Sequence, residues 1–322
     1  MEISRPSDLL QHLLELSLTQ SATEIVVEVE NGGVTVLRVR DNGKGIINIP
    51  TATQKGILQL IHPHCELKVI SKHRGSNKGH YYHSMFGHLH DYRELNCEVG
   101  TDISIIDMFF NLPDKYRKLK KDSDERQQII NTACRFYISH GIAIKLKSSD
   151  KVIFNMPSAQ TLEQRISFLP ASFCEKRLAV IRHAAGTIYI LKSKGVALSN
   201  IYEGEYDLPE GWVDQLKEQL AHDKTLFAIV SLKQNVSEED MTQMLFEIRQ
   251  HLTQWRLNKE REKKELANSV HKPIERETLL RAKIIKGVGK SESPTVVMDK
   301  NELTVTLPNG FTIIIPIRQL GY

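Results

Sequence analysis

The chain has 322 residues, of which 40% are hydrophobic and 25% are charged, a composition typical of a globular protein with a substantial core. Its net charge of +4 is too small to mark an obligate nucleic-acid binder, so contact with DNA would require a local basic patch. The four cysteines form no CxxC pair and no apolar run reaches the length of a membrane span, which argues against a disulfide framework, a cysteine-rich zinc site and a membrane protein.

The first half of the chain predicts a helix followed mostly by strands. Residues 7–19 repeat leucine at helical spacing, and Ser7 is the expected cap. Residues 24–31 and 34–40 alternate as two strands on either side of the turn-forming segment Asn31-Gly32-Gly33. The other expected elements are a short helix at 55–62, strands at 65–71, 80–90 and 100–110, a helix at 122–140 and a hairpin at 142–156.

A second unit begins near residue 160 and mixes helices with strands, which are expected at 161–168, 187–193, 211–221 and 225–232. Ser237, with Asp240 three residues later, predicts the cap of a helix that runs to about residue 256. Residues 258–269 are mostly charged and fit a solvated helix extension or a linker, and Asn309-Gly310 predicts a C-terminal hairpin. This mixed order predicts an α+β fold or an α/β sandwich.

The segment Asp41-Asn42-Gly43-Lys44-Gly45 interrupts the strand pattern, and by itself it is explained by a turn between strands. In register with the helix and hairpin before it, however, it makes residues 4–46 resemble the start of the MutL, Mlh and Pms proteins of the GHKL ATPase superfamily. Arg5-Pro6 stands at the family's ERP, Ala22-Thr23 lies in its GAT segment, and Asp41, Gly43 and Gly45 match its DxGxG motif.

A second block extends the resemblance. Gly100-Thr101 and the segment FFNLPDKYRKLKK are similar to the family's GT and its LFYNxPARRKFLK. The resemblance covers residues 4–160 well and residues 160–257 loosely, and it does not extend to the last 65 residues. It implies an α+β fold with a degenerate GHKL (Bergerat-type) α/β sandwich at 1–158 and a smaller ribosomal-S5-like α/β domain at 159–257. The residue pattern beyond them predicts a charged linker with a β-hairpin tail at 258–322.

The resemblance implies ATP as a cofactor, bound between a helix and the sheet. The family's aspartate accepts a hydrogen bond from the adenine amino group, which can only donate. Its glycines let the backbone approach the ligand, and its threonine helps to hold the base. Carried onto this chain, the implied ATP-binding residues are Asp41, Asn42, Gly43, Gly45 and Thr101.

The residues that would act on the phosphates depart from the family pattern. The family's general base is a glutamate, and His12 stands at that position. Its magnesium-binding asparagine is replaced by Leu16, which offers no oxygen ligand, so bound Mg²⁺ is not expected. Glu15 is close by but points about 100° away from Leu16 on a helix, so it should not substitute. A helix face repacked around an imidazole is the simpler interpretation of His12.

The phosphate lid also departs from the family. Residues 52–55 faintly echo its ATSK segment, but GFRGEAL has no counterpart and the stretch between Gly45 and Gly100 is shorter. Such loops hold anions with successive backbone N–H groups. Where the family's second domain supplies a lysine after NV, Asn235-Val236 is followed by acidic residues. All these departures therefore fall on the phosphate side of the implied pocket.

Two further groups of residues suggest a ligand. Seven histidines lie between His62 and His90 near Cys65, but their spacing fits no zinc motif, and exposed strand histidines are the expected outcome. A basic cluster around Tyr116 could neutralise phosphates of DNA weakly and without sequence preference, although neighbouring acids dilute it and a solvated face is the plain alternative. The basic cluster consists of Lys115, Arg117, Lys118, Lys120 and Lys121.

The function expected from these observations is that of a MutL-like mismatch-repair protein, a pseudo-ATPase with weak or no hydrolysis that acts as a repair or recombination scaffold. The alternatives are an active ATP-dependent DNA clamp, a protein-interaction module that binds no nucleotide, an incomplete gene product, and another GHKL branch such as a histidine kinase, which the FFNLPDKYRKLKK block opposes. The implied partners are other mismatch-repair proteins, a MutL-type heterodimer and weakly bound DNA. Residues 1–10 lack a signal-peptide core, so a nuclear location in a eukaryote, or otherwise a cytoplasmic one, is expected.

Overall fold

The computed structural model describes residues 3–121, 124–193, 201–203, 210–221, 223, 225–232, 236–269, 295–298, 302–306 and 312–316. The chain divides into two compact units between Ile248 and Arg249. The first unit holds an eight-stranded sheet and a four-stranded sheet, and the second holds a three-stranded sheet. None of the described helices is both long and apolar enough to cross a membrane.

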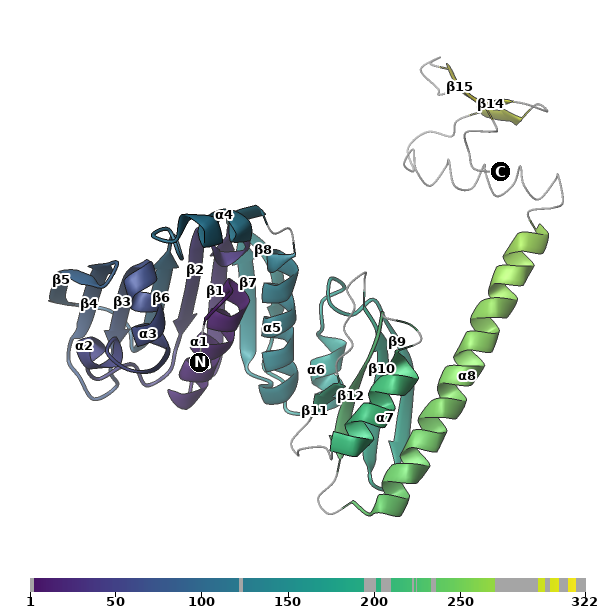
Figure 1. Cartoon of the computed structure of the whole chain (residues 1–322), viewed down its shortest axis with the longest axis horizontal. Coiled ribbons are helices and arrows are strands. Elements are labelled where there is room, and N and C mark those ends of the chain that lie inside the picture. The colour runs from purple at the N-terminus through teal and green to yellow at the C-terminus, as the bar shows by residue number, and fades with distance from the viewer. Residues whose placement is uncertain are drawn as a thin grey trace. The chain divides into compact units, whose positions relative to one another are not determined.

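The eight-stranded sheet is mixed and has the order β5-β4-β3-β6-β2-β1-β7-β8 (Figure 1). Its strands are β1 (Glu24–Glu30), β2 (Val36–Asp41), β3 (Glu66–Lys72), β4 (Gly79–Met85), β5 (His88–Leu95), β6 (Gly100–Ile106), β7 (Ala143–Ser148) and β8 (Lys151–Met156). The pair β1 and β7 is parallel, and each of the other neighbouring pairs is antiparallel. The sheet confirms the expected α+β class.

One face of this sheet is covered by helices (Figure 1). They are α1 (Pro6–Thr19), α2 (Ile49–Ala52), α3 (Gly56–Ile61) and α5 (Glu125–His140), while α4 (Pro113–Lys121) follows β6. Leucines of α1 and the inward residues of the strands, such as Val27 and Leu67, form one buried core. The leucine spacing of α1 and the alternation of β1 and β2 thus fold as their periodicity predicts. Helix α5 ends at His140, as expected, and the next residue, Gly141, has φ 66°.

The segment 80–90, expected as one strand, is instead part of a hairpin. β4 and β5 are joined by Phe86 and Gly87, with φ of 48° and 89°. Two-residue hairpin loops favour such left-handed conformations, and Gly87 is the signal for the turn. This signal is easily overlooked in the sequence, because Phe86 is not a typical turn residue and the polar and apolar residues of the segment alternate as in a single strand.

The four-stranded sheet has the order β11-β12-β10-β9. Its strands are β9 (Lys176–His183), β10 (Gly186–Lys192), β11 (Ile201–Glu203) and β12 (Leu226–Leu232), and the nearby helices are α6 (Leu162–Ser167), α7 (Glu210–Leu220) and α8 (Glu238–Ser269). The Trp212 indole of α7 donates a hydrogen bond of 2.9 Å to the Met241 carbonyl of α8. The sequence does not predict β9 and β11, because neither has a clear period-two pattern.

Helix α8 begins as the capping pattern predicts and extends to Ser269. The Asp240 N–H donates to the Ser237 hydroxyl at 3.1 Å, and that hydroxyl donates to the Asp240 carboxylate at 2.7 Å. The charged residues 258–269 therefore continue the helix rather than form a linker. In the second unit, β13 (Thr295–Met298), β14 (Glu302–Thr306) and β15 (Thr312–Pro316) form an antiparallel sheet, which contains the expected hairpin. Its turn at Asn309-Gly310 lies outside the described residues.

Candidate functional site

Helix α1 starts one residue earlier than Ser7, the residue expected to cap it. Pro6 occupies the first turn, where its missing N–H costs nothing, and the Asp8 carboxylate accepts from the Arg5 N–H at 3.1 Å. Ser7 lies inside the helix, and its N–H donates to the Glu125 carboxylate at 3.1 Å. Arg5 pairs with the same carboxylate at 2.8 Å, so the start of α1 is fastened to the start of α5.

Asp41 ends β2 beneath the last turns of α1, and its side chain is only 9% exposed. One carboxylate oxygen accepts from the Ser17 hydroxyl at 2.8 Å, and the other accepts from the Gly43 N–H at 2.8 Å. Burial raises the pKa of Asp41, and the hydrogen bonds from Gly43 and Ser17 offset only part of that effect. The carboxylate is thus held in one orientation at the junction of helix and sheet.

The loop after Asp41 is held between the end of α1 and the end of β3. The Lys44 N–H donates to the Gln20 carbonyl at 2.7 Å, and the Arg74 N–H donates to the Lys44 carbonyl at 2.8 Å. Gly45 has φ 78°, and a Cβ there would overlap the Lys72 carbonyl oxygen. Gly45 therefore allows the loop to lie close to the chain's own backbone at Lys72.

Thr101 lies beside Asp41 because the two residues pair in the register of β2 and β6. Its hydroxyl is 3.2 Å from the hydroxyl of Ser71, which donates to the Gly100 carbonyl at 2.9 Å and accepts from the Ile46 N–H at 2.8 Å. Ser71 is 1% exposed and joins the loop, β3 and β6. The sequence motifs do not point to Ser17 and Ser71, although each is a hydroxyl residue in an otherwise apolar inward row.

Asn42 has a structural role in this junction. Its side-chain oxygen accepts from the N–H groups of Thr23 and Glu24 at 2.9 and 3.0 Å, and its amide donates to the Thr23 hydroxyl at 2.9 Å. The side chain of Asn42 therefore fixes the start of β1. Of the five implied ATP-binding residues, the structure brings Asp41, Gly43 and Thr101 into one buried group, and Asn42 and Gly45 shape the adjoining loop.

The two degenerate positions lie on α1, preceding Ser17. The His12 Nδ1 atom is 3.2 Å from the Glu15 carboxylate, and the His12 side chain is 28% exposed. Leu16 is half-buried and packs against the hydrophobic core. At the position where the resemblance implies a metal-binding amide, this chain thus places a hydrocarbon side chain, and Glu15 is directed to His12.

The basic cluster lies on α4. Lys115 donates to the Ile3 carbonyl at 3.1 Å and lies 3.7 Å from the Phe109 ring centre. Arg117 contacts Asp114 at 3.3 Å, and Lys120 lies 5.5 Å from the ring centre of Tyr116. Lys118 is exposed and Lys121 ends the helix. The Lys115 side chain is therefore engaged in contacts within the protein, whereas the side chains of Arg117, Lys118 and Lys120 are exposed at the surface and can contact a ligand.

The histidines pair with different neighbours rather than converge on one point. His62 is 3.1 Å from the Tyr82 hydroxyl, His83 is 2.9 Å from the Glu66 carboxylate, and His80 stacks on Tyr92. Burial raises the pKa of the Cys65 thiol to about 12. Within the described ranges, no group of three or more His, Cys, Asp or Glu side chains is placed to hold a metal ion.

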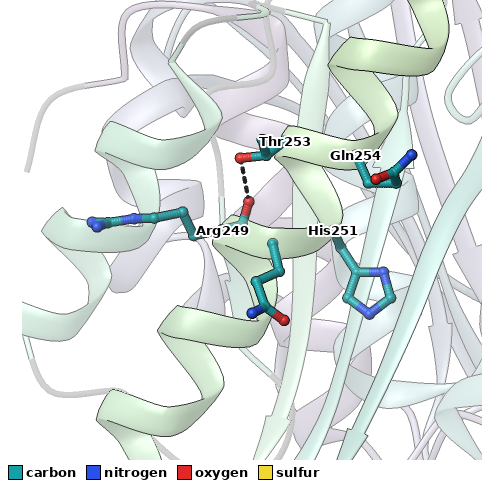
Figure 2. A pocket seen from close by; sticks show the side chains of 5 residues that line it. Arg249, His251, Thr253 and Gln254 are labelled. Atoms are coloured by element: carbon teal, nitrogen blue, oxygen red, sulfur yellow. Dashed lines mark hydrogen bonds between the residues drawn. The ribbon is translucent and has the colours of Figure 1, made fainter.

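A surface hollow of about 590 Å³ lies along α8, in the second unit (Figure 2). Its described lining consists of Arg249, Gln250, His251, Thr253 and Gln254. Figure 2 shows these side chains leaving one helix in different directions, and the Thr253 hydroxyl bonds the Arg249 carbonyl at 2.8 Å. They do not converge on a point, so the described lining of this hollow has no feature of a reaction site.

No protein-family model matches the chain. The DNA mismatch repair protein MutL of Pseudothermotoga lettingae is 30% identical over 184 residues, which cover 49% of this chain and 33% of that protein. MutL of Aquifex pyrophilus is 28% identical over 199 residues, covering 54% of this chain and 46% of that protein. The chain thus spans less than half the length of these relatives.

Solved structures are similar to a larger part of this chain than the sequence relatives are. The Aquifex aeolicus MutL ATPase domain complexed with ADP matches with a TM-score of 0.58 at 21% identity, over 78% of this chain and 98% of that one. The N-terminal domain of a DNA repair protein matches with a TM-score of 0.55 at 15% identity, over 80% of this chain and 96% of that one. The described structure therefore has the α+β fold of a MutL ATPase domain. By sequence, about half of the chain is homologous to the MutL proteins.

Proposed function

We propose that this chain is a MutL-like mismatch-repair protein whose ATPase-like region does not hydrolyse ATP and serves as a scaffold for repair or recombination partners. The observation that carries the proposal is the pair of substitutions on α1. His12 is engaged with Glu15, and the half-buried Leu16 packs against the core. A hard cation requires oxygen ligands, which Leu16 cannot supply, so the charge of the phosphates would not be neutralised.

The base-binding half of the pocket is proposed to remain. The Asp41 carboxylate accepts from Ser17, Gly43 and the Thr101 backbone, and its two oxygens offer about four lone-pair sites, so it can still accept from an adenine amino group. Thr101 lies beside it in the neighbouring strand and carries a hydroxyl. Gly43 and Gly45 shape the loop that follows Asp41, and Asn42 contributes because its side chain fixes the start of β1 next to this loop. ATP is therefore the proposed ligand, without a bound Mg²⁺.

The first test is thermal unfolding of the whole chain with and without excess ATP and Mg²⁺. A ligand that binds only the native state stabilises it by about 2.7 kcal/mol at a hundredfold excess over Kd. We expect a rise in Tm that Asp41→Asn abolishes and that does not require Mg²⁺. A cooperatively melting protein that shows no rise would instead be an interaction module that binds no nucleotide.

Hydrolysis is tested separately, by phosphate release. We expect no release above background from the wild-type chain. Mg²⁺-dependent turnover that disappears in Asp41→Asn would overturn the proposal and favour an active DNA clamp. The variant His12→Glu/Leu16→Asn, which restores the family's two residues, should bind ATP in a Mg²⁺-dependent way if those positions account for the missing metal site.

Other mismatch-repair proteins, including a MutL-type partner subunit, are the proposed partners, with DNA bound weakly through Arg117, Lys118 and Lys120 on α4. These proposals rest on the homology of half the chain and on the exposure of those side chains. A nuclear location is proposed for a eukaryotic source and a cytoplasmic one otherwise. Co-purification of a defined MutL-type subunit with the tagged full chain would support the partner assignment, and its absence under conditions where MutL pairs form would oppose it.

A further inference from the structure

The strand β8 lies at the edge of the eight-stranded sheet opposite β5 (Figure 1). It pairs with β7 on one side. In the part of the chain that the structure describes, no backbone hydrogen bond joins residues 151–156 to any segment other than β7. A strand edge whose outward N–H and C=O groups have no protein partner is a template on which another strand can form.

A groove of about 660 Å³ runs beside this edge. One wall is the hairpin of β7 and β8, and the other is formed by Arg126 of α5 and by residues 170–172. Val152 is 53% exposed, although it is apolar and lies in a strand. The described lining consists of Arg126, Ser148, Ser149, Lys151, Val152, Ile153, Pro170, Ala171 and Ser172. The groove therefore combines apolar surface with hydroxyl donors.

The charge of the described groove lining is positive. The lining contains Arg126 and Lys151 but no carboxylate. Neither cation has a hydrogen bond or ion pair with any described residue. The cations on the nearby open face of the sheet differ, because Arg38 pairs with Asp102 at 2.6 Å and Lys147 pairs with Glu28 at 2.8 Å. Two cations without a described counter-ion, beside a strand edge, select for a negatively charged occupant.

We propose that this groove binds an extended acidic segment of a partner protein, which adds to β8 as a further strand. Main-chain hydrogen bonds to the edge of β8 would supply affinity, as in other cases of strand addition. Alternate side chains of the segment would contact Val152 and Pro170, and its carboxylates would meet Arg126 and Lys151. The apolar surface and the strand edge suit a peptide better than a nucleic-acid duplex, which offers no backbone N–H to the edge.

The test uses the full chain and a fluorescein-labelled heptapeptide of alternating glutamate and valine, titrated by fluorescence anisotropy. Saturable binding that weakens with added salt is expected. The double variant Arg126→Glu/Lys151→Glu should weaken it about tenfold or more, because attraction becomes repulsion at two positions. The matched control, Arg261→Glu/Lys263→Glu, reverses two exposed cations of α8 outside the groove and should bind as the wild type does.

Three results would overturn the proposal. The first is absence of saturable binding by a chain with a normal circular dichroism spectrum. The second is wild-type affinity for both of two peptides, each N-methylated at one of the two alternate sets of residues, since one of the two lacks the donors that strand addition needs. The third is competition by nucleic acid. If duplex DNA displaces the peptide, and the same DNA fails to bind the variant Arg126→Glu/Lys151→Glu, the groove would be assigned to nucleic acid. None of these results depends on whether the chain binds ATP.

Discussion

Ser17 on α1 donates a hydrogen bond of 2.8 Å to the buried carboxylate of Asp41 at the end of β2. This single contact joins the helix that carries the degenerate positions His12 and Leu16 to the strand that carries the proposed base-binding carboxylate. The Gly43 N–H donates to the other oxygen of the carboxylate at 2.8 Å. The orientation of Asp41 is therefore set by the protein before any ligand arrives.

Ser17→Ala should destabilise the chain because it removes a hydrogen bond to a buried charged group. Such bonds contribute about 1.5–3 kcal/mol, more than the gain in helix propensity that alanine brings. The free energy of unfolding in urea measures the effect. Thr19→Ala is the control, since the exposed Thr19 hydroxyl bonds the Leu16 carbonyl of its own helix. Equal stability of the two variants would contradict the importance of the contact between Ser17 and Asp41.

The raised pKa of Asp41 predicts a specific pH dependence of stability. Because the folded state binds this proton more tightly than the unfolded state, whose pKa is about 3.9, the stability from protonated Asp41 is present below that value and is lost as pH rises through the folded pKa. The unfolding free energy of wild type minus that of Asp41→Asn should therefore fall as pH rises from about 4 and then level off. A difference that rises over this window would show that the carboxylate is stabilised rather than penalised by burial.

Alanine substitutions at Gly45 and Gly56 distinguish the stability cost of a left-handed backbone conformation from the cost of a packing overlap. Both have positive φ, 78° and 60°, but a Cβ at Gly45 would overlap the Lys72 carbonyl, whereas nothing lies within 4 Å of one at Gly56. Gly56→Ala should cost about 1–2 kcal/mol for the left-handed conformation alone. Gly45→Ala should cost about 1–3 kcal/mol more because of the overlap. Thermal unfolding of the two variants compares them, and similar decreases in stability would show that the loop can move away from β3.

DNA binding, if α4 supplies it, should depend on Lys118 and Lys120 more than on Lys115. Lys118→Glu/Lys120→Glu should weaken binding of a labelled duplex at low salt, and the slope of log K against log salt should become shallower by about 0.9 for each phosphate that is no longer neutralised. Lys115→Ala should chiefly lower Tm, because this side chain bonds Ile3 and covers Phe109. Anisotropy and melting of the same samples distinguish the two outcomes. Unchanged affinity in the double variant would remove α4 from the proposed DNA contact.

The fold of the first half could be predicted from the sequence because its signals are local. The leucine spacing of α1, the alternation of β1 and β2 and the glycine after α5 each act within a few residues. The motif around Asp41 could be found for the same reason, since its residues are contiguous. The prediction of one strand at 80–90 was wrong because the turn at Phe86 and Gly87 depends on two backbone conformations rather than on periodicity.

What the sequence alone determined about this protein is the order of its main elements, its α+β class and the residues at the positions that the family resemblance implies for ATP. Only the tertiary structure decided that Glu125 fastens Arg5 and Ser7, that Ser17 and Ser71 brace Asp41 and Thr101, and that Arg126 and Lys151 line one groove beside an edge strand. These groups lie far apart in the chain, and a buried polar side chain takes whichever partner the packing of helix on sheet brings within hydrogen-bond distance. The pairing of such side chains therefore produces no periodic pattern in the sequence.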